Sequence, residues 1–297
     1  MPINTQELLD AGCHFGHLKR KWNPKMAPYI FMERNGIHII DLNKTSAKLD
    51  EACDAIKQIA KSGKRILFVA TKKQAKDIVA NAAKSVNMPY ITERWPGGML
   101  TNFATQRKSV KKMTGFDRFM KDETFTNISK KERLQVSRQK AKMEKLIGSI
   151  ADLTRLPAAL FIVDVLKEHI AVSEAQKLGI PTIAICDTNT DPTPIDFPIP
   201  ANDDATKSIS LIMNAMVKAI EEGISERKID KESDREREVA AEDETGEKGD
   251  TDKEFVMAAE EGEEEGGDKP KTVAKKPAGT RSRKPTGGGA AGGPRKK

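Results

Sequence analysis

Short runs of β-branched and aromatic residues alternate with helical patterns along the first two thirds of the chain. The runs are rich in Ile, Val, Leu and Phe, and each has the length of a buried strand. They occupy residues 37–42, 65–70, 89–92, 158–165 and 181–186. This alternation predicts an α/β fold, in which a doubly wound parallel sheet is joined by crossover helices.

The segment between the first two runs predicts a helix over residues 45–62. Its apolar residues return at helical spacing and share one face, and Gly63 then ends the pattern. Similar crossover helices are expected before Pro89 and before Gly179. A last helix is expected over residues 204–223, with Asp203 or Asp204 as its N-cap.

The segment 103–155 is much longer than a crossover connection, which needs about a dozen residues. Residues 129–132 have the capping-box sequence that opens a helix. Apolar residues then return every seven positions at Val136, Met143 and Ile150, and the first half of the segment offers a second apolar stripe. We therefore expect an inserted antiparallel coiled-coil helical hairpin.

Charge divides the chain into three zones. Residues 1–228 contain 36 Lys and Arg against 26 Asp and Glu, and the segment 103–155 alone has 14 bases and 6 acids. Residues 229–268 contain 18 acids and 5 bases, whereas residues 269–297 contain 10 bases and no acid. Blocks of like charge with few apolar residues are typical of disordered chains. The sequence therefore predicts a core domain over 1–228 and a disordered tail over 229–297, acidic and then basic.

The basic core indicates a polyanionic partner, since its summed positive charge attracts nucleic acid. No apolar run has the length of a membrane-spanning helix, and the start of the chain lacks the pattern of a signal peptide. Cys13, Cys53 and Cys186 are widely spaced, which suits a reducing compartment. We expect a cytoplasmic protein with no membrane partner.

Basic residues gather with aromatic ones in the run 12–26, in the segment 93–103 and at the start of the predicted hairpin. Lys and Arg neutralise phosphates, and a Trp ring can stack on an unpaired base. The alternatives are that Trp22 fills the edge of the core and that Gly97 and Gly98 only form a turn. The predicted RNA-binding residues are Lys19, Arg20, Lys21, Trp22, Lys25, Lys72, Lys73, Arg94, Trp95, Arg107, Lys108, Lys111 and Lys112.

Acidic residues follow the last strand, and the predicted topology brings them to the carboxyl edge of the sheet. Asp187, Asp203 and Asp204 would meet His17 of the N-terminal run there. One imidazole with carboxylates is a candidate zinc site. The alternative is that these acids make turns and cap the last helix. We expect that the protein requires no cofactor, whether these acids bind zinc or only form turns and caps.

Catalysis and nucleotide binding lack their usual motifs. The chain has no GxGxxG, GxxxxGK[ST], GxSxG or HExxH sequence. We expect no enzyme activity. Fold class alone does not decide function, so a nucleotide-binding protein of the same architecture and an adaptor with an exposed apolar patch remain as alternatives.

Six motifs taken together resemble one family. HFGH with WNPKM, IHIIDLNKT, RWPGGMLTN, LPAALFIVD, GIPTIAICDTNTDP and IPANDDA follow one another within residues 1–228. In this order they resemble bacterial small-subunit ribosomal protein two. Pro96 departs from the pattern, because this family usually has Leu there.

The resemblance implies a flavodoxin-like sheet with a protruding coiled-coil hairpin. It also implies a structural constituent of the small ribosomal subunit that is bound to 16S ribosomal RNA in the cytoplasm. The expected partners are that RNA and other small-subunit proteins, including the large mRNA-binding protein one, which the chain would help to hold.

Overall fold

The computed structural model describes residues 4–120, 122, 125 and 128–246, without the side chains of residues 117, 234 and 236–246. The chain divides into two units, residues 1–240 and residues 241–297, and the contacts given below all lie within the first. In the described part of the chain, no helix is long and apolar enough to cross a membrane.

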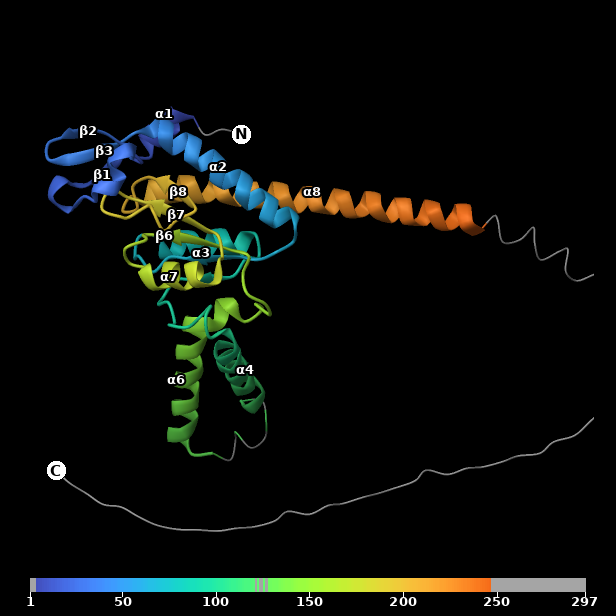
Figure 1. Ribbon diagram of the computed structural model, residues 1–297. Coiled ribbons are helices and arrows are strands. Elements are labelled where there is room, and N and C mark those ends of the chain that lie inside the picture. Colours follow the sequence, from blue (N-terminus) through green and yellow to red (C-terminus); the bar gives the residue numbers. More distant parts are fainter. Residues whose placement is uncertain (1–3, 121, 123–124, 126–127, 247–297) are drawn as a thin grey trace, which may run out of the picture. The chain divides into compact units, whose positions relative to one another are not determined.

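A parallel sheet of five strands forms the centre of the first unit (Figure 1). Its order is β5-β4-β6-β7-β8, and every neighbouring pair is parallel. Counted from β4, this is the order 2-1-3-4-5 of flavodoxin-like sheets. The α/β class and the parallel sheet are thus confirmed. The strands are β4 (Ile66–Val69), β5 (Tyr90–Ile91), β6 (Ala159–Val163), β7 (Thr182–Cys186) and β8 (Phe197–Pro200).

The first predicted strand was assigned to the wrong sheet. β3 (Ile37–Ile40) lies between β1 (Phe15–Leu18) and β2 (Ile30–Arg34) in a separate antiparallel sheet, here called the N-terminal sheet. Asn35 and Gly36 both have positive φ and join β2 to β3 in a tight turn. Asn-Gly between apolar runs is a strong hairpin signal, and a prediction from hydrophobic periodicity alone does not include it.

The fifth parallel strand, β8, was not predicted from the sequence. Its sequence FPIP has a proline at every second position, and proline removes a donor from the ladder. β8 pairs only with β7 and lies at the edge of the sheet, where proline is tolerated.

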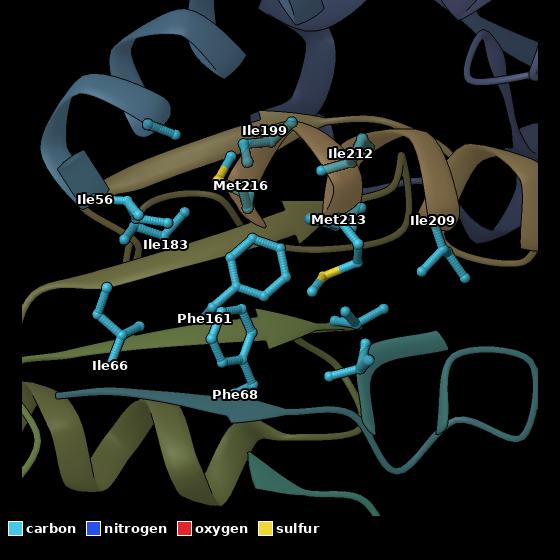
Figure 2. Close-up of a cluster of buried hydrophobic side chains, with 14 of the residues drawn as sticks. Ile56, Ile66, Phe68, Phe161, Ile183, Ile199, Ile209, Ile212, Met213 and Met216 are labelled. Carbon is cyan, nitrogen blue, oxygen red and sulfur yellow. The ribbon is translucent and has the colours of Figure 1, made fainter. Parts of the chain in front are cut away.

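Helices cover both faces of the parallel sheet, so the central strands β4, β6 and β7 are buried throughout. On one face, Phe68 and Phe161 pack with their ring centres 5.4 Å apart beneath α2 and α8 (Figure 2). On the other face, Leu67 and Leu160 pack against α7 and the base of the inserted segment. The helices of the first face are α1 (Thr5–Asp10), α2 (Leu42–Lys61), α3 (Lys76–Ser85) and α8 (Thr206–Gly246), and that of the second is α7 (His169–Leu178).

The inserted segment forms two helices, α4 (Phe103–Phe119) and α6 (Lys130–Ile147), followed by the 3-10 turn η3 (Gly148–Ile150). The two helices lie side by side and are antiparallel (Figure 1). The turn η3 at the base of the hairpin contacts the edge strand β5. The predicted cap is confirmed, because the Glu132 backbone N–H donates to Ser129 Oγ at 3.3 Å. Val110 and Ile147 are buried near the sheet, whereas Val136 further out is half-buried.

Helix α8 continues well past the predicted boundary at residue 228. Its acidic residues pair with lysines of α2: Lys57 contacts Glu226 at 2.8 Å, and Lys61 contacts Asp230 at 3.1 Å. The predicted tail boundary thus falls inside α8, which helix-favouring charged residues continue to Gly246. The disorder of the tail stays a prediction. Its remainder, residues 247–297, lies outside the described residues.

The close packing of α8 on α2 can be tested at Gly223. A Cβ there would lie 2.5 Å from the Lys57 carbonyl oxygen and 3.0 Å from Ala60 Cβ, whereas a Cβ at Gly115 of α4 meets nothing within 4 Å. In an open helix Gly→Ala stabilises by about 0.5–1 kcal/mol. We expect Gly115→Ala to do so, and Gly223→Ala to destabilise by about 1–3 kcal/mol because of the clash. Urea unfolding of both variants measures the two signs, and a stabilised Gly223→Ala would contradict this packing.

Candidate nucleic-acid interface and acidic edge

The N-terminal basic run lies beside the carboxyl ends of β7 and β8. The Asn23 backbone N–H donates to the Thr188 carbonyl oxygen at 2.8 Å, and the Asn202 N–H donates to that of Cys13 at 3.1 Å. Lys19, Arg20 and Lys21 form the exposed 3-10 turn η1. Their charges are thus presented at the surface by a segment that is anchored through its backbone.

Two cations of this run have acidic neighbours. Lys19 Nζ lies 2.7 Å from Glu33 Oε2, and Lys25 Nζ lies 2.6 Å from Asp191 Oδ2. All four side chains are more than one third exposed, and exposed ion pairs of this kind contribute little free energy. Both lysines therefore remain available to a stronger polyanionic partner.

The N-terminal sheet has an apolar outer face. Bulges in β1 and β2 place Phe15 and Met32 opposite Ile39, and Leu18 opposite Ile37. Phe15, Met32 and Leu18 are 51%, 48% and 40% exposed. We call these five residues the outer apolar face.

The inner face of the N-terminal sheet is packed on the core side. Trp22, 37% exposed, packs on the ring of buried His38 with 5.1 Å between the ring centres. Trp22 thus fits parts of both predictions, because one part of the ring packs at an edge of the fold and the rest is exposed to a partner.

The loop between β5 and α4 is organised by a residue far away in the sequence. The buried carboxylate of Glu174 in α7 accepts hydrogen bonds from Trp95 Nε1 at 3.1 Å and from the Gly98 backbone N–H at 2.8 Å. Trp95 is only 6% exposed, so its ring is not offered to an RNA base as the sequence suggested. Arg94 beside it is exposed.

The first helix of the hairpin presents Lys108, Lys111 and Lys112 to solvent. Arg107 has a different position, since its Nη1 donates to the carbonyl oxygens of Leu153 at 2.8 Å and of Ala151 at 3.3 Å. It joins the two ends of the inserted segment.

The loop after β4, where a doubly wound fold often binds phosphate, is occupied by the protein's own carboxylates. The Thr71 backbone N–H and hydroxyl both donate to Glu168 Oε1. Lys72 Nζ lies 2.9 Å from Asp203 Oδ1 and 2.6 Å from Asp204 Oδ1. Lys73 alone of the loop's basic residues is exposed.

The acidic edge predicted from the sequence is assembled in the structure. His17 Nδ1 lies 2.9 Å from Asp187 Oδ2, and His17 Nε2 lies 3.6 Å from Asp204 Oδ2. Within the described residues, His17, Asp187 and Asp203 offer ligand atoms that all lie within 4.8 Å of one another. Asp203 and Asp204 lie in the turn before α8, which begins at Thr206, and in this turn Asn202 Oδ1 accepts from the Asp204 and Ala205 N–H groups.

Protonation at this edge departs from ordinary values. The hydrogen bond to Asp187 raises the pKa of His17. Burial, together with the neighbouring charge of Asp187, raises the pKa of Asp203 to about 7. Burial alone would lower the pKa of Lys72, but hydrogen bonds to Asp204 and Asp203 outweigh it and raise the pKa to about 12.

Apart from Lys73 and Arg94, the exposed residues of the predicted RNA-binding set lie in two regions, the N-terminal run and the first helix of the hairpin. The hairpin leaves at the β5 edge, and the N-terminal run lies against the loops that follow β7 and β8 (Figure 1). Sequence reasoning did not identify Glu168 and Glu174, and two acidic residues in a helix give no signal of such contacts.

Comparison with known proteins agrees with the motifs. The family model described as Ribosomal protein S2 matches residues 8–223. Small ribosomal subunit protein uS2 of Phocaeicola vulgatus is 70% identical over 228 residues, which cover 77% of this chain and 82% of that protein. The proteins of the same name from Bacteroides fragilis and Cytophaga hutchinsonii are 69% and 66% identical, each across 77% of this chain and across 82% and 91% of their own lengths. The chain belongs to the ribosomal protein S2 family of the small ribosomal subunit.

Proposed function

We propose that the chain is a structural constituent of the small ribosomal subunit that binds 16S ribosomal RNA without catalysis, in the bacterial cytoplasm. Its family is a family of ribosomal proteins, not of enzymes. The observation that carries the proposal is the pair of exposed basic regions, the N-terminal run and the first helix of the hairpin. Two such regions suit contacts with two separate stretches of RNA backbone.

The proposed RNA contacts are the exposed members of the predicted set. In the N-terminal region they neutralise phosphates around a partly exposed Trp ring, and in the hairpin they follow the outer side of α4. They are Lys19, Arg20, Lys21, Trp22, Lys25, Lys73, Arg94, Lys108, Lys111 and Lys112. The other members of the predicted set have a structural role, because they contact groups of the protein itself: Lys72, Trp95 and Arg107. The hairpin acts as a coiled-coil arm.

A nucleotide-binding role is disfavoured by the loop after β4. The N–H and hydroxyl groups of Thr71 donate hydrogen bonds to Glu168, and Lys72 forms ion pairs with Asp203 and Asp204. A phosphate would have to displace buried carboxylates from these donors, and charge repulsion opposes its approach.

The outer apolar face supports a second contact, with protein. Aromatic and Met side chains are enriched at the centre of protein interfaces. We assign this face to the large mRNA-binding protein one of the same subunit, while the neighbouring basic run binds RNA.

The acidic edge is proposed to bind one divalent ion, with zinc favoured because an imidazole takes part. Asp203 Oδ2 is buried and has no hydrogen-bond partner among the residues that the structure describes, which leaves this oxygen available to a cation. His17, Asp187, Asp203 and Asp204 would supply the ligands, and the ion would compete with Lys72 and with the proton of Asp203.

RNA binding can be tested by a salt series. Each phosphate neutralised contributes about −0.7 to −0.9 to the log-log slope of affinity against salt. Replacing Lys108, Lys111 and Lys112 by Gln should reduce the slope by about two to three units. Replacing Lys19, Arg20 and Lys21 by Gln should do the same, and the two effects should add because the regions lie apart.

The control for the salt series removes equal charge elsewhere, by Lys177→Gln, Lys207→Gln and Lys218→Gln on exposed positions of α7 and α8. Filter binding to one 16S RNA fragment measures all three triple variants. If the control lowers the slope as much as the others, the two regions are not the RNA-binding surface.

The protein contact can be tested with Phe15→Gln combined with Met32→Gln. Both side chains are about half exposed, so the fold should be kept while apolar contact area is lost. Binding of purified protein one should weaken by about tenfold or more, as expected for loss of 1.4 kcal/mol. Leu178→Gln, which alters a 43% exposed residue of α7, is the matched control. Equal binding by all variants argues against this face.

The metal proposal predicts a pH-dependent response to zinc. His17 and Asp203 both bind protons more tightly in the folded state, so in chelator the free energy of unfolding should fall as pH rises from about 4 to about 8. Zinc needs the deprotonated ligands and should therefore raise the melting temperature more at pH 8 than at pH 6. Asp187→Asn should abolish the gain, whereas Lys72→Met should enlarge it by removing the competing ammonium. Elemental analysis far below one zinc per chain would exclude the site.

A further inference from the structure

The carboxylate of Glu174 is surrounded by donors from a single loop. Besides Trp95 Nε1 and the Gly98 N–H on Oε1, the Leu100 N–H donates to Oε2 at 2.9 Å, and the Thr101 N–H and hydroxyl do so at 3.2 and 3.3 Å. Glu174 is 6% exposed. Both oxygens of a buried carboxylate are therefore used by the loop, which lies more than seventy residues away in the sequence.

The loop has the construction of a backbone anion site. Three N–H groups within four residues converge on one carboxylate, and Gly98 has a φ of +78°, a conformation that lets successive N–H groups point inward. Burial alone would raise the pKa of Glu174, but the hydrogen bonds from Trp95, Leu100, Gly98 and Thr101 outweigh it and the pKa is lowered. The site thus holds a charged carboxylate, not a neutral acid.

The position of this loop links it to the hairpin. Helix α4 begins at Phe103, two residues after Thr101, and Val110 and Met113 of α4 are buried in the same apolar cluster as Trp95, Met99 and Leu100. Helix α7 is fixed to the sheet through Ala171, Val172 and Ala175. A displacement of the loop relative to α7 would therefore turn the first helix of the hairpin.

We propose that residues 95–101 form an anion-binding loop filled by Glu174 of the same chain, and that Glu174 is a positioning residue that sets the direction of the RNA-binding hairpin. The consequence for RNA rests on the proposed function, whereas the filling of the loop does not. The Gly98 N–H then binds an internal carboxylate and is not available to an RNA phosphate.

Glu168, the residue just before the first residue of α7, provides a matched control. Within the described part of the chain, it accepts from the Thr71 N–H and hydroxyl through Oε1 alone. Gln can reproduce both bonds with its single carbonyl oxygen. At position 174, Gln instead places an NH₂ group against N–H donors that need an acceptor. Glu168→Gln should be nearly neutral, and Glu174→Gln should lower the melting temperature of the full chain by about 4–8 °C.

Rescue by a small carboxylate distinguishes a filled anion site from ordinary packing. Glu174→Ala leaves the loop donors unpaired beside a vacated space, so sodium acetate should raise its melting temperature, with sodium chloride at equal ionic strength as the reference. Wild type and Glu168→Ala should show no acetate-specific gain, because the first keeps its own carboxylate and the second lacks the convergent N–H groups. If Glu174→Ala does not fold without acetate, the yield of refolding in acetate replaces the melting temperature.

The positioning role is read from amide exchange and RNA affinity. In Glu174→Gln, the amides of Gly98, Leu100 and Thr101 and the first turns of α4 should exchange faster, while amides of α2 keep their protection. Affinity for the 16S RNA fragment should fall about tenfold with an unchanged salt slope, because the number of surface cations is unchanged.

Two outcomes overturn the proposal. Acetate that stabilises wild type and Glu174→Ala equally would show that the loop is no anion site, and unchanged exchange at Gly98, Leu100 and Thr101 would show that Glu174 does not order it. If wild type fails to bind RNA at any salt concentration, the proposed function fails, and the acetate and exchange results still decide the role of Glu174.

Discussion

The three central strands of the parallel sheet, β4, β6 and β7, are buried on both faces, and this constraint decides where the rest of the chain can go. Alternate side chains of β4, β6 and β7 face two separate apolar clusters, so each face needs its own cover of helices. Helices α2 and α8 supply one cover, and α7 with the base of the hairpin supplies the other. Polar chemistry is thereby confined to the sheet edges and to the loops at the strand ends.

The loops at the strand ends are held by buried carboxylates. Glu168 and Glu174, at the start of α7 and within it, reach two different loops. Asp187 and Asp203, in the loops after β7 and β8, contact His17 and Lys72. A buried charge is stable only where donors or opposite charges surround it, so each of these acids fixes the backbone or cation that it contacts. In related architectures the same places bind a phosphate, and here they are filled from within the chain.

Internal pairing of this kind separates structural charge from charge that is available to a partner. Cations close to the sheet, such as Lys72 and Arg107, are engaged with acids or carbonyl oxygens. Cations on η1 and on the outer side of α4 are exposed. A small-subunit protein needs the second kind, because contacts to RNA backbone depend on charge and position more than on base identity.

The sequence by itself determined the α/β class, the inserted helices, their Ser129 cap and the family, because these follow from local periodicity, local capping chemistry and ordered motifs. It also placed His17 with Asp187 and Asp203, since parallel strands bring their carboxyl ends to one edge. The predicted tail boundary at 228 falls inside α8, which extends to Gly246, and composition gave no sign that Glu226 and Asp230 of this helix lie beside Lys57 and Lys61 of α2. The strand FPIP was missed because only its edge position makes proline acceptable there. Tertiary structure alone decided that Trp95 is buried and that Glu174 fills the loop beside it, because a hydrogen bond between residues 76 positions apart leaves no trace in either local pattern.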